Sequence, residues 1–309
     1  MDSLAAAPGT GPATSPLPVV RPPRPAAKYE DLPTGRALVM GILNVTPDSF
    51  SDGGQFQDLD SAIGHGLRMF YAGADIIDVG GESTRPGADS VSEEEEQKRI
   101  LPVVATLVKA GALVSVDTMN ASTAAKAIDA GAAMVNDISG LNFDPKMPAL
   151  VAERGVPYVL THRRGDAGTM DQHTDYDDLA TEVIEEITSV RSKFYDAGVT
   201  PEQIIVDPGL GFSKNGEQNW ELLRSLDRFN ELGHRVLVGA SRKRFIGSLL
   251  ISAGKAAPVE ERDHATAAVS ALAVHHGAWA VRVHDVAANL DAVKVAAAWA
   301  APKDGAKDD

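Results

Sequence analysis

The sequence predicts an α/β fold of the TIM-barrel class, an eight-stranded (β/α) barrel in a single domain. Short apolar runs alternate with amphipathic stretches, eight such pairs follow one another, and together they span about 265 residues. This alternation implies parallel strands joined by right-handed crossovers. An open doubly wound sheet is the alternative. No Gly-x-Gly-x-x-Gly turn follows the first strand, so a dinucleotide site of that kind has no support.

Each predicted strand is an apolar run rich in β-branched residues that ends in polar residues or glycine. Such runs are typical of parallel strands, which are buried on both faces. The predicted strands cover 37–44, 74–81, 113–117, 133–137, 157–162, 203–209, 235–241 and 279–285.

The amphipathic stretches between these runs predict helices, and some carry explicit start or stop signals. Ser92 followed by Glu95 fits a capping box, and Pro201 closes the turn after one long helix. The acidic run Glu93–Glu96 suits a first helical turn because of the helix dipole. The predicted helices lie near 58–72, 92–110, 120–131, 145–154, 176–197, 217–232, 262–277 and 286–300.

The two ends of the chain differ from the barrel, which is predicted to cover 36–301. Residues 1–35 hold eight of the 18 prolines and have little to bury, so this leader is predicted to be disordered. It lacks the features of a signal peptide, and its prolines would break the helix of a transit peptide. We therefore expect a cytoplasmic protein. Residues 302–309 are predicted to be a solvated tail.

Composition excludes several classes of function. The 309 residues include no cysteine, which excludes disulfides, a thiol nucleophile and a thiolate metal site. The formal net charge of −14 argues against nonspecific binding to nucleic acid or to an anionic membrane. No apolar run reaches the roughly 18 residues that a membrane span needs. An anionic substrate would therefore have to be held by locally clustered cations.

Polar side chains collect at the carboxyl ends of the predicted strands, where the active sites of such barrels lie. Arg282 and His284 share one face of their strand and two valines share the other, so Arg282 and His284 should point into the barrel mouth. Asn136 and Asp137 are adjacent, so at most one of them can face inward. The strand-end candidates are Asn44, residues 82–85, Asp117, Asn136, His162, Asp207, Ser241, Lys243, Arg282 and His284.

These candidates predict a site with two parts. The carboxylates of Asp117 and Asp207 can pair with the edge of a flat, nitrogen-rich heterocycle. Arg85, Arg282 and His284, with helix N-termini, offer positive potential to phosphate oxygens. Each residue alone has an ordinary explanation, such as a helix N-cap for Asp117. Their convergence at one end of eight strands carries the prediction.

Two polar, Gly-rich segments, 45–56 and 80–90, follow the first two predicted strands and are long for such connections. Long loops on the catalytic face of a barrel commonly close over substrate. We therefore expect both to act as lids.

Several motifs carry a family resemblance. The stretches MGILNVTPDSFSDGG (40–54) and DIIDVGGESTRPGA (75–88) resemble the two hallmarks of the dihydropteroate synthase family. VSVDT, MVNDISG, DPGLGFSK, GASRK and VRVHDV then follow in the family's order, so the resemblance covers residues 36–300. It implies an enzyme that joins 6-hydroxymethyl-7,8-dihydropterin pyrophosphate to para-aminobenzoate, giving 7,8-dihydropteroate and pyrophosphate in folate synthesis. It also implies sulfonamides as competitive inhibitors and a homodimer.

The resemblance assigns roles to individual residues. Asp117, Asn136, Asp207 and Lys243 would hold the pterin. Asn44 would ligate magnesium, and Arg282 and His284 would bind the pyrophosphate. Phe212 and Pro86 would shape the aminobenzoate pocket. Further substrate contacts would come from Ser241 and from the loop residues Asp48, Thr84 and Arg85. The residues expected in catalysis are Asp48, Arg85, Asp117, Asp207 and Lys243.

The chain departs from the family pattern at two places. Leu160–Arg164 reads Leu-Thr-His-Arg-Arg where the family usually shows Met-His-Met, and Arg244 stands where many members have serine. The sequence shows no insertion beside Phe212, which favours a sulfonamide-sensitive enzyme. Two alternatives are a methyltetrahydrofolate-dependent methyltransferase domain and a degenerate paralogue that only binds. The apolar, small-residue-rich segment 265–280 is consistent with burial against a partner.

Overall fold

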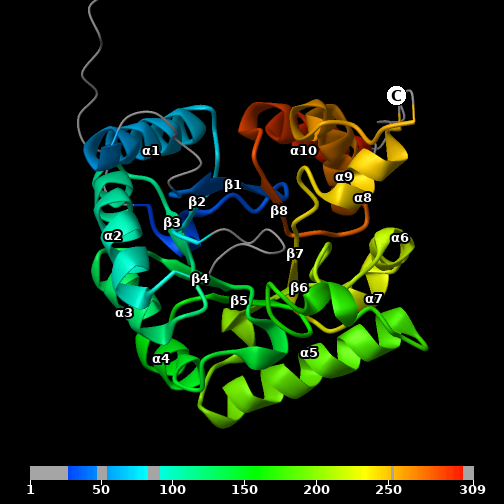
Figure 1. The fold of residues 1–309 in the computed structure, drawn as a ribbon, viewed down its shortest axis with the longest axis horizontal. Helices are drawn as coiled ribbons and strands as arrows, with labels where there is room; N and C mark the ends of the chain where they lie inside the picture. The colour runs from blue at the N-terminus through cyan, green and yellow to red at the C-terminus, as the bar shows by residue number, and fades with distance from the viewer. Residues whose placement is uncertain (1–26, 47–53, 83–90, 252–253, 302–309) are drawn as a thin grey trace, which may run out of the picture.

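A computed structural model describes residues 27–46, 54–82, 91–251 and 254–301. Eight parallel strands form a closed barrel in which each strand pairs with the next and β8 pairs with β1. The helices lie around this barrel (Figure 1). The predicted barrel is therefore confirmed. The strands are β1 (Leu38–Asn44), β2 (Ile76–Gly80), β3 (Val114–Asp117), β4 (Met134–Asp137), β5 (Tyr158–Thr161), β6 (Ile204–Asp207), β7 (Arg235–Val238) and β8 (Ala280–Val283).

The helices agree with the predicted positions except after β6 and β7. The predicted helix 217–232 is divided into two, and an additional short helix follows β7. Ser92 caps its helix as expected, with its Oγ accepting a hydrogen bond from Glu95 N at 3.3 Å. The α-helices are α1 (Gly54–Tyr71), α2 (Glu93–Lys109), α3 (Ala121–Asp129), α4 (Met147–Arg154), α5 (Leu179–Asp196), α6 (Gly216–Arg224), α7 (Leu226–Asn230), α8 (Arg244–Leu249), α9 (Asp263–His275) and α10 (Val286–Ala300).

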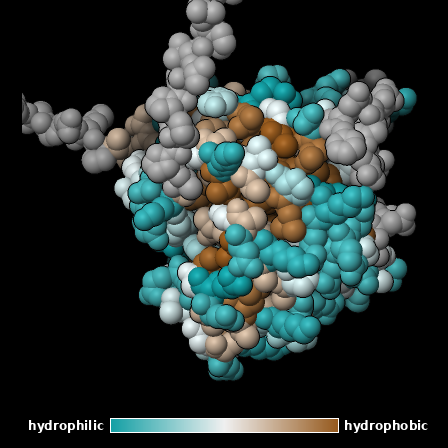
Figure 2. Space-filling view, turned by 90° about the vertical axis from the view of Figure 1, so that its left-hand side faces the viewer, coloured by the Kyte–Doolittle hydropathy of each residue, from teal (hydrophilic) through white to brown (hydrophobic). Residues whose placement is uncertain are grey.

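Short 3-10 turns complete the fold. They are η1 (Tyr29–Asp31), η3 (Gly140–Asn142), η4 (Met170–Gln172), η5 (Pro201–Gln203) and η6 (Val259–Arg262). Within the described part of the chain, no helix is long and apolar enough to cross a membrane. Hydrophilic and apolar side chains are interspersed on the side of the molecule seen in Figure 2.

The strands bury different residues on their two faces, as the period of two requires. The outward faces pack against the helices in one large apolar cluster. The inward faces are apolar near the start of the strands and polar near their end. The apolar inner layer consists of Leu38, Met40, Ile76, Leu113, Met134, Val159, Ile205, Leu237 and Ala280.

The N-terminal end of the barrel is covered by residues that the sequence analysis assigned to the disordered leader. Ala27, Tyr29 and Leu32 pack against the apolar inner layer, and the Tyr29 ring lies 6.2 Å from the ring of Trp279. The guanidinium of Arg235 lies over both rings. The boundary at residue 35 is therefore wrong, since the ordered chain begins by residue 27. Residues 1–26 and 302–309 lie outside the described residues.

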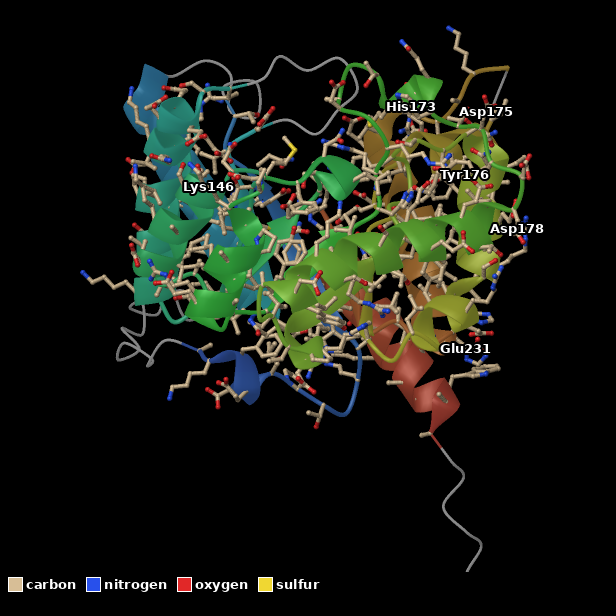
Figure 3. The ribbon with its side chains drawn as sticks, turned by 90° about the horizontal axis from the view of Figure 1, so that it is seen from below. Lys146, His173, Asp175, Tyr176, Asp178 and Glu231 are labelled. Carbon is tan, nitrogen blue, oxygen red and sulfur yellow. The ribbon has the colours of Figure 1, made fainter. Side chains whose placement is uncertain are left out.

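Figure 3 shows the barrel from the side, with η1 at one end and the labelled His173 and Tyr176 toward the other. These two residues belong to the segment between β5 and α5. The apolar layer and η1 thus close one end, and the polar strand ends are gathered at the opposite end.

Candidate active site

A buried network of charges forms the floor of the site. Arg282 on β8 donates from Nε to Asp78 Oδ2 at 2.6 Å and from Nη2 to Asp117 Oδ2 at 2.5 Å. Asn136 on β4 donates from Nδ2 to the same Asp78 oxygen at 2.8 Å. One guanidinium therefore connects carboxylates from β2 and β3, and the carboxamide of β4 completes the network.

The network confirms two predictions about side-chain direction. Arg282 points into the barrel, as the alternation in its strand predicts. Asn136 does the same, whereas the adjacent Asp137 points outward and accepts a hydrogen bond from the Tyr158 hydroxyl at 2.7 Å. Of the two neighbours in β4, one therefore faces inward, as expected.

Burial sets the protonation of this network. It raises the pKa of Asp117 to about 7, with Arg282 opposing the shift and Asp78 adding to it. Burial lowers the pKa of Arg282, but the carboxylates of Asp78 and Asp117 outweigh burial, and the net pKa is raised. The guanidinium therefore keeps its charge, while burial favours the neutral form of Asp117.

Asp207 and Lys243 at the mouth influence each other's charge. Burial raises the pKa of Asp207, and Lys243 opposes this shift. Burial lowers the pKa of Lys243 to about 8, against the effect of Asp207. The Lys243 ammonium also lies 4.4 Å from the centre of the Phe212 ring and donates to the carbonyl of Leu210. The lysine therefore connects the segment between β7 and α8 to the loop after β6.

That loop needs glycine at two positions. Gly209 has φ +73°, and a Cβ there would lie 1.8 Å from the carbonyl oxygen of His162. Gly211 has φ +75°, and a Cβ would lie 2.8 Å from Cδ of Lys243. Asp207 Oδ1 fixes the start of the loop by accepting from Gly209 N at 2.8 Å. The close approach of the loop to β5 and to Lys243 brings Phe212 to the site.

A buried lysine supports the same loop from beneath. Lys214 donates to Gly209 O at 3.1 Å and to Phe212 O at 2.9 Å, and its Nζ lies 2.9 Å from His162 Nδ1. Burial lowers the pKa of Lys214 to about 7. Burial also lowers the pKa of His162 to about 4, so its neutral ring donates from Nε2 to Glu186 at 2.7 Å and accepts from Lys214.

Ser241 and His284 meet at the edge of the site nearest β8. Ser241 Oγ lies 2.9 Å from His284 Nδ1 and accepts from His284 N at 3.1 Å. This pair joins the segment after β7 to the segment after β8, so both predicted residues lie beside Lys243 and Arg282 in the fold.

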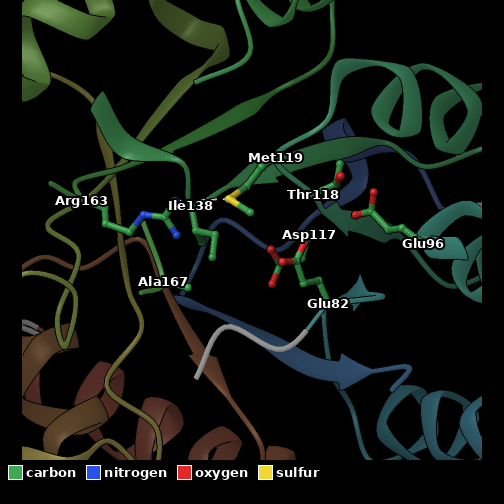
Figure 4. Close-up of a pocket in the computed structure, with 8 residues that line it drawn as sticks. All are labelled: Glu82, Glu96, Asp117, Thr118, Met119, Ile138, Arg163 and Ala167. Carbon is green, nitrogen blue, oxygen red and sulfur yellow. Dashed lines mark hydrogen bonds between the residues drawn. The ribbon is translucent and has the colours of Figure 1, made fainter. Parts of the chain in front are cut away.

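A pocket of about 340 Å³, part of it open to solvent, lies beside the network (Figure 4). Asp117 and Glu82 lie on one side in Figure 4, and Arg163 approaches from the other. Burial raises the pKa of Glu82, and Glu96 adds to the shift. The lining residues are Glu82, Glu96, Asp117, Thr118, Met119, Ile138, Arg163 and Ala167.

The predicted metal ligand can be tested against the donors present. Asn44 ends β1 and offers one amide oxygen. Among the described residues, no group of three or more His, Cys, Asp or Glu side chains could hold a metal ion. Magnesium commonly takes one or two protein ligands together with substrate phosphates. Magnesium ligation by Asn44 stays a prediction.

The structure gathers most of the predicted residues at one end of the barrel. Asp48, Thr84, Arg85 and Pro86, and with them most of the two proposed lids, lie outside the described residues. Arg244, the departure noted after Lys243, lies on the surface and pairs with Asp171 at 2.9 Å. Those brought together at the mouth are Asp117, Asn136, Asp207, Phe212, Ser241, Lys243, Arg282 and His284.

The sequence analysis missed Asp78 and Lys214. Asp78 could have been found, because the alternation used for Arg282 places Ile76, Asp78 and Gly80 on one face of β2. Lys214 gave no such signal, since its partners lie on β5 and in its own loop.

Comparisons with known proteins agree with this geometry. Residues 40–284 match the model of a family described as pterin binding enzyme. The dihydropteroate synthase of Mycobacterium leprae is 49% identical over 263 residues, covering 84% of this chain and 93% of the relative.

Solved structures give the same result. The dihydropteroate synthase of Xanthomonas albilineans with 4-aminobenzoic acid has a TM-score of 0.79 and 43% identity, covering 86% of this chain and 94% of that one. The Yersinia pestis enzyme with a sulfonamide drug has a TM-score of 0.80 and 40% identity, covering 87% of this chain and 96% of that one. The chain therefore belongs to the dihydropteroate synthase family of pterin-binding transferases of folate biosynthesis.

Proposed function

We propose that this member of the family condenses 6-hydroxymethyl-7,8-dihydropterin pyrophosphate with para-aminobenzoate, giving 7,8-dihydropteroate and pyrophosphate. The observation that carries the proposal is the set of polar side chains at the mouth. Asp117, Asn136 and Asp207 offer the acceptors and donors that an aminopyrimidinone edge requires. Lys243 and Arg282 place positive charge beside them.

The proposed reaction is a dissociative substitution. The C–O bond to pyrophosphate breaks early, because the electron-rich dihydropterin stabilises the carbocation that remains. Asp117 and Asp207 would supply the negative charge that stabilises that cation. The aniline nitrogen of para-aminobenzoate is already nucleophilic, so no strong general base and no covalent enzyme intermediate are required.

The leaving pyrophosphate needs a compensating positive charge. His284 and Arg282 are the proposed contacts, although Arg282 is paired with Asp78 and Asp117 in this structure. Asn44 would hold magnesium together with the substrate, and the bound ion would neutralise charge on the departing group. The apolar inner layer and η1 close the N-terminal end of the barrel to water, which would limit hydrolysis of the cation.

The second substrate is proposed to lie near Phe212. The relatives described above bind 4-aminobenzoic acid and a sulfonamide drug. The cation–π contact of Phe212 with Lys243 holds one apolar ring beside the pterin-binding residues. We propose that sulfonamides compete with para-aminobenzoate for this place.

A homodimer is also proposed, formed through α8, α9 and α10, which lie together in Figure 1. Large apolar side chains are exposed on these helices, including Leu249 at 65%, Leu272 at 62% and Trp299 at 81%. Such a concentration of exposed apolar side chains is typical of an interaction surface. The cytoplasmic location stays a prediction.

The experiment is pyrophosphate release by the purified chain with the dihydropterin pyrophosphate and magnesium, with and without para-aminobenzoate. Mass spectrometry of the same samples detects dihydropteroate. Release that depends on para-aminobenzoate and matches the dihydropteroate formed would support the proposal. Binding of the pterin without product would contradict it in favour of a degenerate paralogue.

A further inference from the structure

Thr161 is the last residue of β5, and its side chain faces the interior of the barrel. Tyr158 and Leu160 belong to the outer apolar cluster, whereas Val159 belongs to the inner layer. Because alternate residues of a strand point to opposite faces, Thr161 shares the inner face with Val159. The register pairs Thr161 with Asp207 on β6. The two side chains therefore lie next to each other at the polar mouth.

The Thr161 hydroxyl is buried without a hydrogen-bond partner. The residue is 1% exposed, and no atom of the described chain pairs with its Oγ1. The hydroxyl of Tyr158, on the outer face of the same strand, donates to Asp137 at 2.7 Å. An unpaired buried hydroxyl destabilises the folded state and is uncommon in native proteins. The hydroxyl therefore lies at the polar end of β5, next to Asp207, with its hydrogen-bonding capacity unused in the free chain.

The surroundings of Thr161 suit a flat polar ring. Ile138 and Phe212, which follow β4 and β6, belong to a small apolar cluster and flank β5. Asp207 supplies a carboxylate on the neighbouring strand. A threonine hydroxyl can donate one hydrogen bond and accept others, so it can meet either a ring nitrogen or an N–H group.

We propose that Thr161 is a further substrate-binding residue, whose hydroxyl hydrogen-bonds the pterin at the edge that Asp207 meets. This inference deepens the function proposed above and rests on it. A group that is unpaired in the free enzyme and paired in the complex favours substrates that supply the matching polar atom. Thr161 would thus sharpen the preference for a nitrogen-rich heterocycle without serving the free fold.

The test compares Thr161→Val, which removes only the hydroxyl from a side chain of the same shape, with Thr161→Ser, which restores it. Tyr158→Phe is the matched control, because it removes a partnered hydroxyl from the opposite face of the same strand. Calorimetry measures the Kd for 6-hydroxymethyl-7,8-dihydropterin pyrophosphate with magnesium and without para-aminobenzoate. Thermal unfolding of each free protein and the KM for both substrates complete the set.

The proposal predicts opposite effects on stability and on binding. Thr161→Val should have an unchanged or higher Tm, yet a Kd for the pterin about tenfold weaker, equivalent to about 1.4 kcal/mol. The KM for para-aminobenzoate should not change, and Thr161→Ser should return the Kd to near the wild-type value. Tyr158→Phe should show the reverse pattern, with a lower Tm and an unchanged Kd.

Two results would overturn the inference alone. The first is a Kd for the pterin in Thr161→Val that equals the wild-type value. The second is a lower Tm in Thr161→Val together with a weaker Kd that Thr161→Ser does not restore, because this combination indicates a structural role. Failure of the wild-type chain to bind the pterin would instead overturn the proposed function, and this inference with it.

Discussion

Replacing Arg282 with methionine should destabilise the folded chain by about 3–5 kcal/mol, because it leaves two buried carboxylates without their counter-charge. The side chains of Asp78 and Asp117 are 0% and 6% exposed, so the guanidinium is the main partner of both carboxylates in the folded chain. For a chain of this size the expected fall in Tm is about 6–20 °C. Urea unfolding, followed by circular dichroism, measures the free energy directly.

The loss of folding free energy caused by Arg282→Met should grow as the pH rises above neutrality. In the wild type the folded pKa of Asp117 is about 7, above the unfolded value of 3.8, so its contribution to stability declines between those two values. Without Arg282 the folded pKa rises further, and the folded variant keeps a proton that the unfolded chain has released. Its stability should then continue to fall above pH 7, by up to about 1.4 kcal/mol per pH unit.

Asp117→Asn in the Arg282→Met background is the control, since it removes one of the two carboxylates that lose their partner. The additional loss of stability above pH 7 should be smaller in the double variant than in the single variant. An equal deficit at about pH 6 and about pH 9 in the single variant would refute the electrostatic reasoning. A deficit below about 1 kcal/mol would show that the two carboxylates find other partners.

Three further changes test other parts of the structure. Lys214→Met removes the donor to two loop carbonyls and should raise the KM for para-aminobenzoate about tenfold, more than it raises the KM for the pterin. Steady-state kinetics measures both KM values, and equal rises would contradict this prediction. Leu272→Glu should shift the sedimentation of the proposed dimer toward monomer, and an unchanged coefficient would exclude α9 from the interface. Tyr29→Ala should lower the free energy of unfolding, measured in urea, by about 1–2 kcal/mol, because the contact with Trp279 is lost, while kcat stays unchanged. An unaltered free energy of unfolding would show that η1 is not needed for stability.

The barrel and much of its mouth could be predicted because both follow from local patterns. Alternation along single strands placed Arg282 and Asn136 inside and Asp137 outside, and the structure agrees. The same rule places Asp78 inside the barrel, although it lies two residues before the end of β2. The predicted site contained only residues at strand ends, so it did not include Asp78.

Other features depend on contacts between distant segments, which no local pattern encodes. Lys214 meets His162 across 52 positions of the chain, and a basic residue after a Gly-rich loop is equally compatible with the surface. The packing of residues 27–35 was not predicted for a related reason. The prolines near the N-terminus predict disorder by composition, while Tyr29 is ordered by packing on Trp279.

The apolar inner layer has a consequence for the protonation of Asp117. Among the described residues, that layer and η1 cover one end of the barrel, so the mouth is the nearer route between solvent and Asp117. A ligand seated at the mouth would lie on that route and would change the surroundings of Asp117. Ligand binding and protonation of Asp117 should therefore be coupled, so that the affinity for the ligand depends on pH.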